Sequence, residues 1–320
     1  MSIQSRVVIA GGIGIAATLF SFYRLSTGGR GEWDFAWAVG GARDLLSGVD
    51  PYNDLHLGAW EAPLFYPLPA LFVGMAFVPL PHIWGAAVFI GISSGLLAFG
   101  LTRRGLAPLV TFLSLPYLWA ASIGQWSIVV TAAGLIPELS FLLLMKPTLG
   151  LSILAGFPSR KAIAVLAAAV AATAVLSIVW FPQWFGEWLV NVGEGSHVPP
   201  ILVFPGWLLP VALLYRKLPT ARLLFVFACV PQWLDFYDQV VLFLIPRSSR
   251  QYAYLAIASW AWMPIWRLFP PGHPFHLDRY LWDIVFDLAA LGLVLAQGRG
   301  WATTGGEASS MPDDLAAAPV

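Results

Sequence analysis

The stretch AIAVLAAAVAATAVLSIVW, residues 162–180, decides the fold class of this chain. It contains no charged side chain, and a helix of about 20 such residues crosses about 30 Å of hydrocarbon. Arg160 and Lys161 stand directly before it. Because short cytoplasmic loops of membrane proteins are rich in Lys and Arg, the stretch predicts a membrane-spanning helix that begins at the cytoplasmic face.

Further apolar stretches extend on both sides of this helix. Several contain prolines, and a broken backbone persists at membrane depth only where protein or a cavity satisfies it. The sequence therefore predicts an all-α, polytopic membrane protein with about ten membrane-spanning or re-entrant helices. The other candidate stretches are 7–23, 63–81, 83–101, 106–121, 126–157, 200–215, 218–234, 239–246, 251–268 and 281–297.

Composition agrees with a membrane protein. The chain is 58% hydrophobic and 11% charged, with a mean hydropathy of +0.75, whereas globular chains carry roughly 25% charged residues. These figures exclude a soluble or disordered chain. Equal numbers of basic and acidic residues, 17 of each, exclude a basic nucleic-acid binder. A single cysteine, Cys229, excludes an internal disulfide.

The distribution of basic residues predicts the topology. Loops with paired basic residues should be cytoplasmic, and we expect one domain over 1–297 with a disordered cytoplasmic tail over 298–320. Two complete spans at 63–81 and 83–101 would place Arg103 on the same side as the loop 25–62. We therefore expect at least one broken or re-entrant helix in the first half. The protein as a whole is expected to be a multi-pass protein of the plasma membrane.

The loop 25–62 holds six of the acidic residues, and we expect it to be extracytoplasmic. Its residues 33–46 predict an amphipathic helix at the membrane interface, which ends at Gly48. Asp34 would begin this helix, with the small residues Ala38 and Gly41 leaving space above the carboxylate. The expected apolar stripe consists of Phe35, Val39, Ala42 and Leu46.

The sequence allows two interpretations of the role of Asp34. Acidic residues are common in the first turn of a helix, where the helix dipole favours them. A carboxylate held at the edge of a membrane can also act as a general base that takes a proton from an attacking hydroxyl. Spacing alone favours the first reading.

Six short elements follow one another along the chain: Trp33-Asp34-Phe35, Gly48-Val49-Asp50-Pro51-Tyr52, Tyr66-Pro67-Leu68-Pro69, Gly124-Gln125-Trp126, Lys146-Pro147, and residues 231–238. Their order and spacing resemble glycosyltransferase family 87, of the C-type integral membrane superfamily. Leu68 stands where that family usually has a second proline, and the last element lacks its histidine.

The resemblance implies a C-type glycosyltransferase fold and a sugar transfer on the extracytoplasmic face. The donor would be a polyprenyl-phosphate sugar, mannose above all, and the acceptor a lipid- or glycan-linked hydroxyl. Asp34 would be the catalytic base of an inverting reaction. No cofactor beyond the donor substrate is implied.

A departing lipid phosphate needs a cation or oriented donors. Lys146 lies inside an apolar run, and an ionisable group at membrane depth is by default a functional candidate. The alternatives are a lysine that reaches the interface or pairs with Glu138. Arg43, with Arg24 and Arg30, is a competitor for the phosphate.

The remaining candidates would contact the sugar or the acceptor. Asp235 and Asp238 lie three residues apart, a spacing that places both acids on one helical face. Two carboxylates can hold a divalent metal, but no further ligand spacing supports one, so we expect no metal. His273 and His276 lack a third ligand, and His197 is expected at the surface, with acceptor contact as an alternative. The predicted sugar- and acceptor-binding residues are Gln125, Asp235, Tyr237, Asp238 and Tyr66.

Two other functions remain as alternatives. A membrane transporter or flippase would also have broken helices and buried polar residues, although no internal repeat is visible. A degenerate, non-catalytic member of the family is the second alternative.

Overall fold

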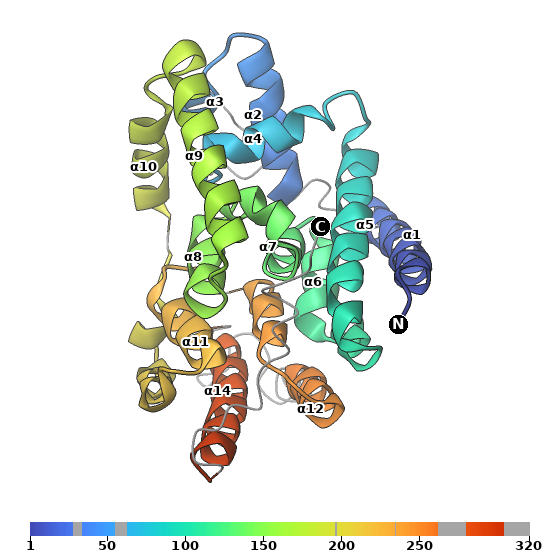
Figure 1. Ribbon diagram of the computed structural model, residues 1–320. Helices are drawn as coiled ribbons and strands as arrows, with labels where there is room; N and C mark the ends of the chain where they lie inside the picture. The colour runs from blue at the N-terminus through green and yellow to red at the C-terminus, as the bar shows by residue number, and fades with distance from the viewer. Residues whose placement is uncertain (28–33, 55–62, 196, 234, 262–279, 304–320) are drawn as a thin grey trace, which may run out of the picture.

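The computed structural model describes residues 1–27, 34–54, 63–195, 197–233, 235–261 and 280–303. Within these ranges the chain is helical and forms no strand, which confirms the all-α class. A single isolated antiparallel bridge joins Val198 and Gln232. Figure 1 shows α2, α3 and α4 at one end of the molecule and α12 with the end of α14 at the other.

Four helices of the described residues are long and apolar enough to cross a membrane. They are α1 (Ile3–Thr27), α5 (His82–Leu101), α9 (Arg160–Trp180) and α14 (Tyr280–Thr303). The expected helix over 162–180 is confirmed by α9. The count of about ten remains a prediction, because the other apolar stretches form shorter elements. The predicted start of the tail at residue 298 is too early, because α14 continues to Thr303. Residues 304–320 lie outside the described ranges.

The shorter elements begin at prolines in many cases. Proline suits the first helical turn, where its missing N–H leaves no hydrogen bond unmade. Prolines therefore divide the apolar stretches into pieces. The α-helices are α2 (Asp34–Leu46), α3 (Pro51–Asp54), α4 (Leu68–Met75), α6 (Leu115–Ser122), α7 (Ser127–Ala133), α8 (Pro147–Gly156), α10 (Trp184–Glu194), α11 (Pro219–Cys229) and α12 (Ser249–Trp260). The 3₁₀ helices are η1 (Thr102–Arg104), η2 (Ala107–Leu113), η3 (Pro137–Leu144), η4 (Pro200–Leu202), η5 (Gly206–Tyr215) and η6 (Asp238–Leu244).

The expected break in the first half is confirmed. The stretch 126–157 is divided into α7, η3 and α8, with Pro137 and Pro147 at the starts of the last two. The candidate stretch 63–81 does not form a complete span, in agreement with the expected break. Its only helix is α4, whose eight residues extend about 12 Å, too short to cross the hydrocarbon.

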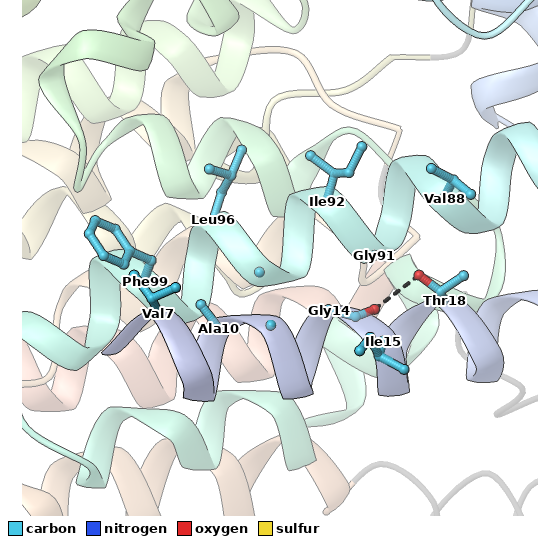
Figure 2. Close-up of a pocket in the computed structure, with 12 residues that line it drawn as sticks. Val7, Ala10, Gly14, Ile15, Thr18, Val88, Gly91, Ile92, Leu96 and Phe99 are labelled. Carbon is cyan, nitrogen blue, oxygen red and sulfur yellow. Dashed lines mark hydrogen bonds between the residues drawn. The ribbon is translucent and has the colours of Figure 1, made fainter. Parts of the chain in front are cut away.

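The helices α1 and α5 pack antiparallel through glycines (Figure 2). A Cβ at Gly14 would lie 2.9 Å from the Gly91 carbonyl oxygen. Small residues let two helix backbones approach this closely in a membrane. At the far end of the pair, the Arg6 guanidinium donates to the Phe99 carbonyl oxygen at 2.7 Å. The contact places Arg6 and the nearby Arg103 at one end of the pair, away from α2.

The helix α2 is confirmed, and Gly48 follows it with a φ of +75°. The expected space above Asp34 is filled. A Cβ at Gly41 would meet the Leu64 and Leu71 side chains at 3.2 and 3.1 Å, because α4 packs against α2 through its small residues. Phe35, Val39 and Ala42 of the expected stripe are buried, but Leu46 is exposed. Because α2 buries residues on most of its circumference, it is an interior helix, and one apolar stripe does not describe it.

Candidate functional site

The backbone fixes Asp34 opposite the turn between α6 and α7. The Asp34 amide donates to the Ile123 carbonyl oxygen at 3.2 Å. Gly124 follows with a φ of +71°, a conformation that side chains disfavour. A Cβ at Gly124 would also lie 3.4 Å from the Phe35 Cβ. Glycine therefore permits the turn that brings Gln125 to the start of α2.

Both carboxylate oxygens of Asp34 accept a hydrogen bond from a side chain. The Tyr66 hydroxyl donates to Oδ1 at 3.2 Å. The Gln125 amide Nε2 donates to Oδ2 at 2.6 Å. The Trp126 backbone N–H donates to Gln125 Oε1 at 3.1 Å, which fixes the orientation of this amide.

The hydrogen bonds continue from Gln125 to a buried ion pair. Lys146 Nζ donates to Gln125 Oε1 at 3.4 Å and to Asp238 Oδ1 at 2.6 Å. The same ammonium lies 4.5 Å from the centroid of the Tyr237 ring. We call the connected side chains Asp34, Tyr66, Gln125, Lys146 and Asp238 the polar chain.

Helix breaks bring the polar chain together. Lys146 precedes Pro147, and a residue before proline is held in an extended conformation, here with φ −139° and ψ 82°. Asp238 is the first residue of η6. Tyr66 and Gln125 lie just before α4 and α7. Each side chain therefore projects from a place where the chain changes direction.

Burial governs the electrostatics of the polar chain. Gln125 and Asp238 are 1% and 2% exposed, and the Lys146 side chain is 16% exposed. Burial raises the pKa of Asp34 to about 6, against the opposing effects of Lys146 and the two hydrogen bonds. Burial and the charge of Asp34 hold the pKa of Tyr66 well above its ordinary value, so its hydroxyl remains a donor.

Six of the seven candidates that sequence analysis grouped around Asp34 lie near it. Four of them are the other members of the polar chain. The fifth is Tyr237, whose ring lies against Lys146, and the sixth is Asp235, whose charge also raises the pKa of Asp34. Arg43 is the exception. It is exposed, about 13 Å further along α2, and faces His82 Nε2 at 3.4 Å. Arg30 lies outside the described residues.

The alternative pairing of Lys146 with Glu138 is wrong. Glu138 Oε1 accepts from Lys161 Nζ at 2.5 Å, at the exposed end where α9 begins. Lys146 is therefore held inside the protein, with Asp238 as its counter-ion.

His197, which was expected at the surface, lies partly inside the protein. It is half-buried, and its ring contacts the rings of Phe65 and Trp233 at centroid distances of 5.1 and 5.8 Å. Burial lowers the pKa of His197, and the Lys146 charge lowers it further. The contact depends on chain segments far apart in sequence, so no local signal reveals it.

Two acids on α14 were also missed. Asp283 and Asp287 are 1% and 0% exposed, and no carboxylate oxygen of either makes a hydrogen bond of good geometry among the described residues. They interrupt the apolar stretch 281–297. Acidic residues inside such a stretch are visible in the sequence and indicate candidate functional residues.

No group of three or more His, Cys, Asp or Glu is arranged to hold a metal ion in the described ranges. His273 and His276 lie outside them. Comparison of the chain with protein-family models, curated proteins and solved structures found no match. The described residues thus form a helical protein with four helices long and apolar enough to span a membrane, and with a polar chain that includes the carboxylates of Asp34 and Asp238.

Proposed function

We propose that this protein is an integral membrane glycosyltransferase. It transfers a sugar, with mannose as the first candidate, from a polyprenyl-phosphate donor to a hydroxyl of a lipid- or glycan-linked acceptor. The observation that carries the proposal is the hydrogen-bonded connection from Asp34 through Gln125 to Lys146. It joins a candidate base to a candidate phosphate ligand, and the sequence elements that resemble family 87 supply both residues.

Asp34 supplies the base in this proposal. A general base works best when its pKa lies near the working pH, and burial raises the pKa of Asp34 to about 6. Tyr66 and Gln125 each donate to one carboxylate oxygen, which holds the group in one orientation. An acceptor hydroxyl must reach a remaining lone pair of the same carboxylate.

The reaction moves one proton and exchanges one bond at the anomeric carbon. The acceptor O–H gives its proton to Asp34, and its oxygen forms a bond to the anomeric carbon. The bond from that carbon to the phosphate oxygen breaks on the opposite face, and its electron pair leaves with the lipid phosphate. The configuration at the anomeric carbon is therefore inverted.

Lys146 stabilises the charge that develops on the leaving phosphate. Asp238 neutralises this ammonium while no donor is bound, at an N–O distance of 2.6 Å. A phosphate monoanion or dianion competes with Asp238 for the same hydrogen-bond donors. Lys146 thus contacts the donor, and Asp238 positions Lys146.

The site belongs to the extracytoplasmic half in this proposal. Arg6 and Arg103 mark one end of the α1–α5 pair, and basic ends favour the cytoplasm. The helix α1 runs from that end to Thr27, and α2 with Asp34 follows at the other end (Figure 1).

The test is sugar transfer by the full chain in membranes. Synthetic polyprenyl-phosphate mannose and polyprenyl-phosphate glucose, each radiolabelled, are supplied with a lipid extract as acceptor. The proposal predicts a labelled product from one donor, with an anomeric configuration opposite to that of the donor. A product of retained configuration contradicts the mechanism. Donor movement across the bilayer without transfer supports a flippase instead.

A further inference from the structure

Three aromatic rings meet beside the polar chain. Phe65, His197 and Trp233 come from three chain segments, and we call them the aromatic cluster. Phe65 and His197 are edge-on at 5.1 Å, His197 and Trp233 edge-on at 5.8 Å, and Phe65 and Trp233 are 6.3 Å apart. Phe65 directly precedes Tyr66, which donates to Asp34.

The aromatic cluster is not part of the hydrophobic core. Each of its three residues is half-buried, and none of them belongs to the cluster of buried hydrophobic residues that forms the core of the described chain. Trp126, by contrast, is 0% exposed and packs on Phe35 and Phe89. Core packing therefore does not account for the arrangement of the cluster.

Backbone contacts hold the cluster in place from two sides. The bridge between Val198 and Gln232 makes both of its hydrogen bonds, at 2.9 and 3.2 Å. It fixes the residues next to it, His197 and Trp233, beside one another. On the other side, Trp188 Nε1 donates to the Phe65 carbonyl oxygen at 2.8 Å.

Glycine is required beneath His197. Gly195 has an ordinary backbone conformation, with φ −75°, so alanine could adopt it. A Cβ at Gly195 would nevertheless overlap the His197 ring and lie 3.1 Å from Phe65. The position of the imidazole thus depends on the absence of one methyl group.

Charged groups of the polar chain act electrostatically on the His197 imidazole. Burial and Lys146 lower the pKa of His197, and Asp238 raises it. The result is a preset apolar wall with an imidazole, beside a carboxylate and an ammonium. Ligand sites combine apolar and aromatic walls with a few polar groups in this way. A pyranose ring fits such a wall, because its C–H face packs on aromatic rings while its hydroxyls bond to polar neighbours.

We propose that the aromatic cluster binds the hexopyranose ring of the substrate, with Phe65 and Trp233 against the sugar and His197 bonded to a hydroxyl. The inference deepens the function proposed above and rests on it. It assigns sugar recognition to three residues, whereas Asp34 and Lys146 carry out the chemistry.

Saturation-transfer NMR tests this wall directly. The full chain in nanodiscs of deuterated lipid is mixed with methyl α-D-mannopyranoside or methyl α-D-glucopyranoside. We expect saturation of the sugar C–H protons by the wild type, a loss of at least fivefold in Trp233→Ala, and retention in Trp233→Phe. Trp207→Ala is the matched control, because Trp207 is 59% exposed and contacts Phe204 elsewhere.

Gly195→Ala gives a second, independent change. It displaces the imidazole without removing a ring, so it should lower the saturation signal as His197→Ala does. Equal signals in wild type, Trp233→Ala and Gly195→Ala, or no signal from either sugar, would overturn the inference. Saturation without sugar transfer in the membrane assay would instead count against the transferase and keep a hexose site.

Discussion

Asp34 combines burial with two hydrogen bonds and a nearby cation. Burial disfavours the charged carboxylate, whereas Lys146 and the donors Tyr66 and Gln125 favour it. The sequence placed Asp34 at the start of a helix, but it could not show the burial. That depends on Gln125 and Tyr66, which lie 91 and 32 residues away along the chain.

The pKa of Asp34 predicts the acid limb of the pH–rate profile. Below a pH of about 6 the carboxyl is protonated and cannot accept the acceptor proton. We expect kcat/KM to fall about tenfold per pH unit below that value and to level off above it. Steady-state transfer assays between pH 4.5 and 8 measure this. A rate independent of pH down to 4.5 would exclude Asp34 as the titrating group.

The Lys146–Asp238 pair predicts a large stability effect. Lys146→Met leaves the Asp238 carboxylate buried without its cation, which should cost about 3–5 kcal/mol. Adding Asp238→Asn removes the stranded charge and should restore part of the loss. Thermal unfolding in detergent of both variants and the wild type is the measurement. A double variant no more stable than Lys146→Met would contradict the pairing.

At the scale of the elements, prolines determine where several helices begin. Pro137 and Pro147 divide the stretch 126–157, and the sequence indicated this break because one helix could not be so long. The stretch 63–81 was different, since its apolar composition resembles a span although α4 is only eight residues long. Hydropathy shows that a stretch is apolar, but it does not distinguish a membrane-spanning helix from a short helix that is buried against α2.

The α1–α5 contact predicts that a glycine inside it and a glycine outside it respond differently to substitution. A Cβ at Gly91 would overlap Thr18 and lie 2.8 Å from the Gly14 carbonyl oxygen. Gly91→Ala should therefore destabilise the protein by about 1–3 kcal/mol. Gly12→Ala, where nothing lies within 4 Å, should be neutral or slightly stabilising because alanine favours helix. Thermal unfolding in detergent compares them, and equal effects would refute the packing.

At the scale of the whole molecule, basic residues and helix lengths agree on one orientation. Because α4 does not span, α5 follows α1 as the next long helix, and Arg103 falls at the same end as Arg6. The sequence predicted the cytoplasmic side of Arg103 from its charge. A complete span at 63–81 would have placed Arg103 on the opposite side of the membrane. The sequence alone did not resolve this conflict, because the short length of α4 depends on tertiary packing.

Cysteine labelling tests this orientation in intact cells. In a Cys229→Ala background, Ser47→Cys at the end of α2 should react with a membrane-impermeant maleimide. Gly105→Cys, beside Arg103 and Arg104, should react only after the cells are permeabilised. Labelling of Gly105→Cys from outside would reverse the orientation.

The central claim is that Asp34 is the base of a glycosyl transfer. The most direct measurement compares the rate of sugar transfer by wild type, Asp34→Asn and the control Asp44→Asn, which lies on the same helix. Asparagine keeps the shape but cannot accept the proton, so we predict a loss of about 10²–10⁴-fold in Asp34→Asn with equal protein in the membrane. Asp44→Asn should retain wild-type transfer. Equal transfer by Asp34→Asn and wild type would contradict the account.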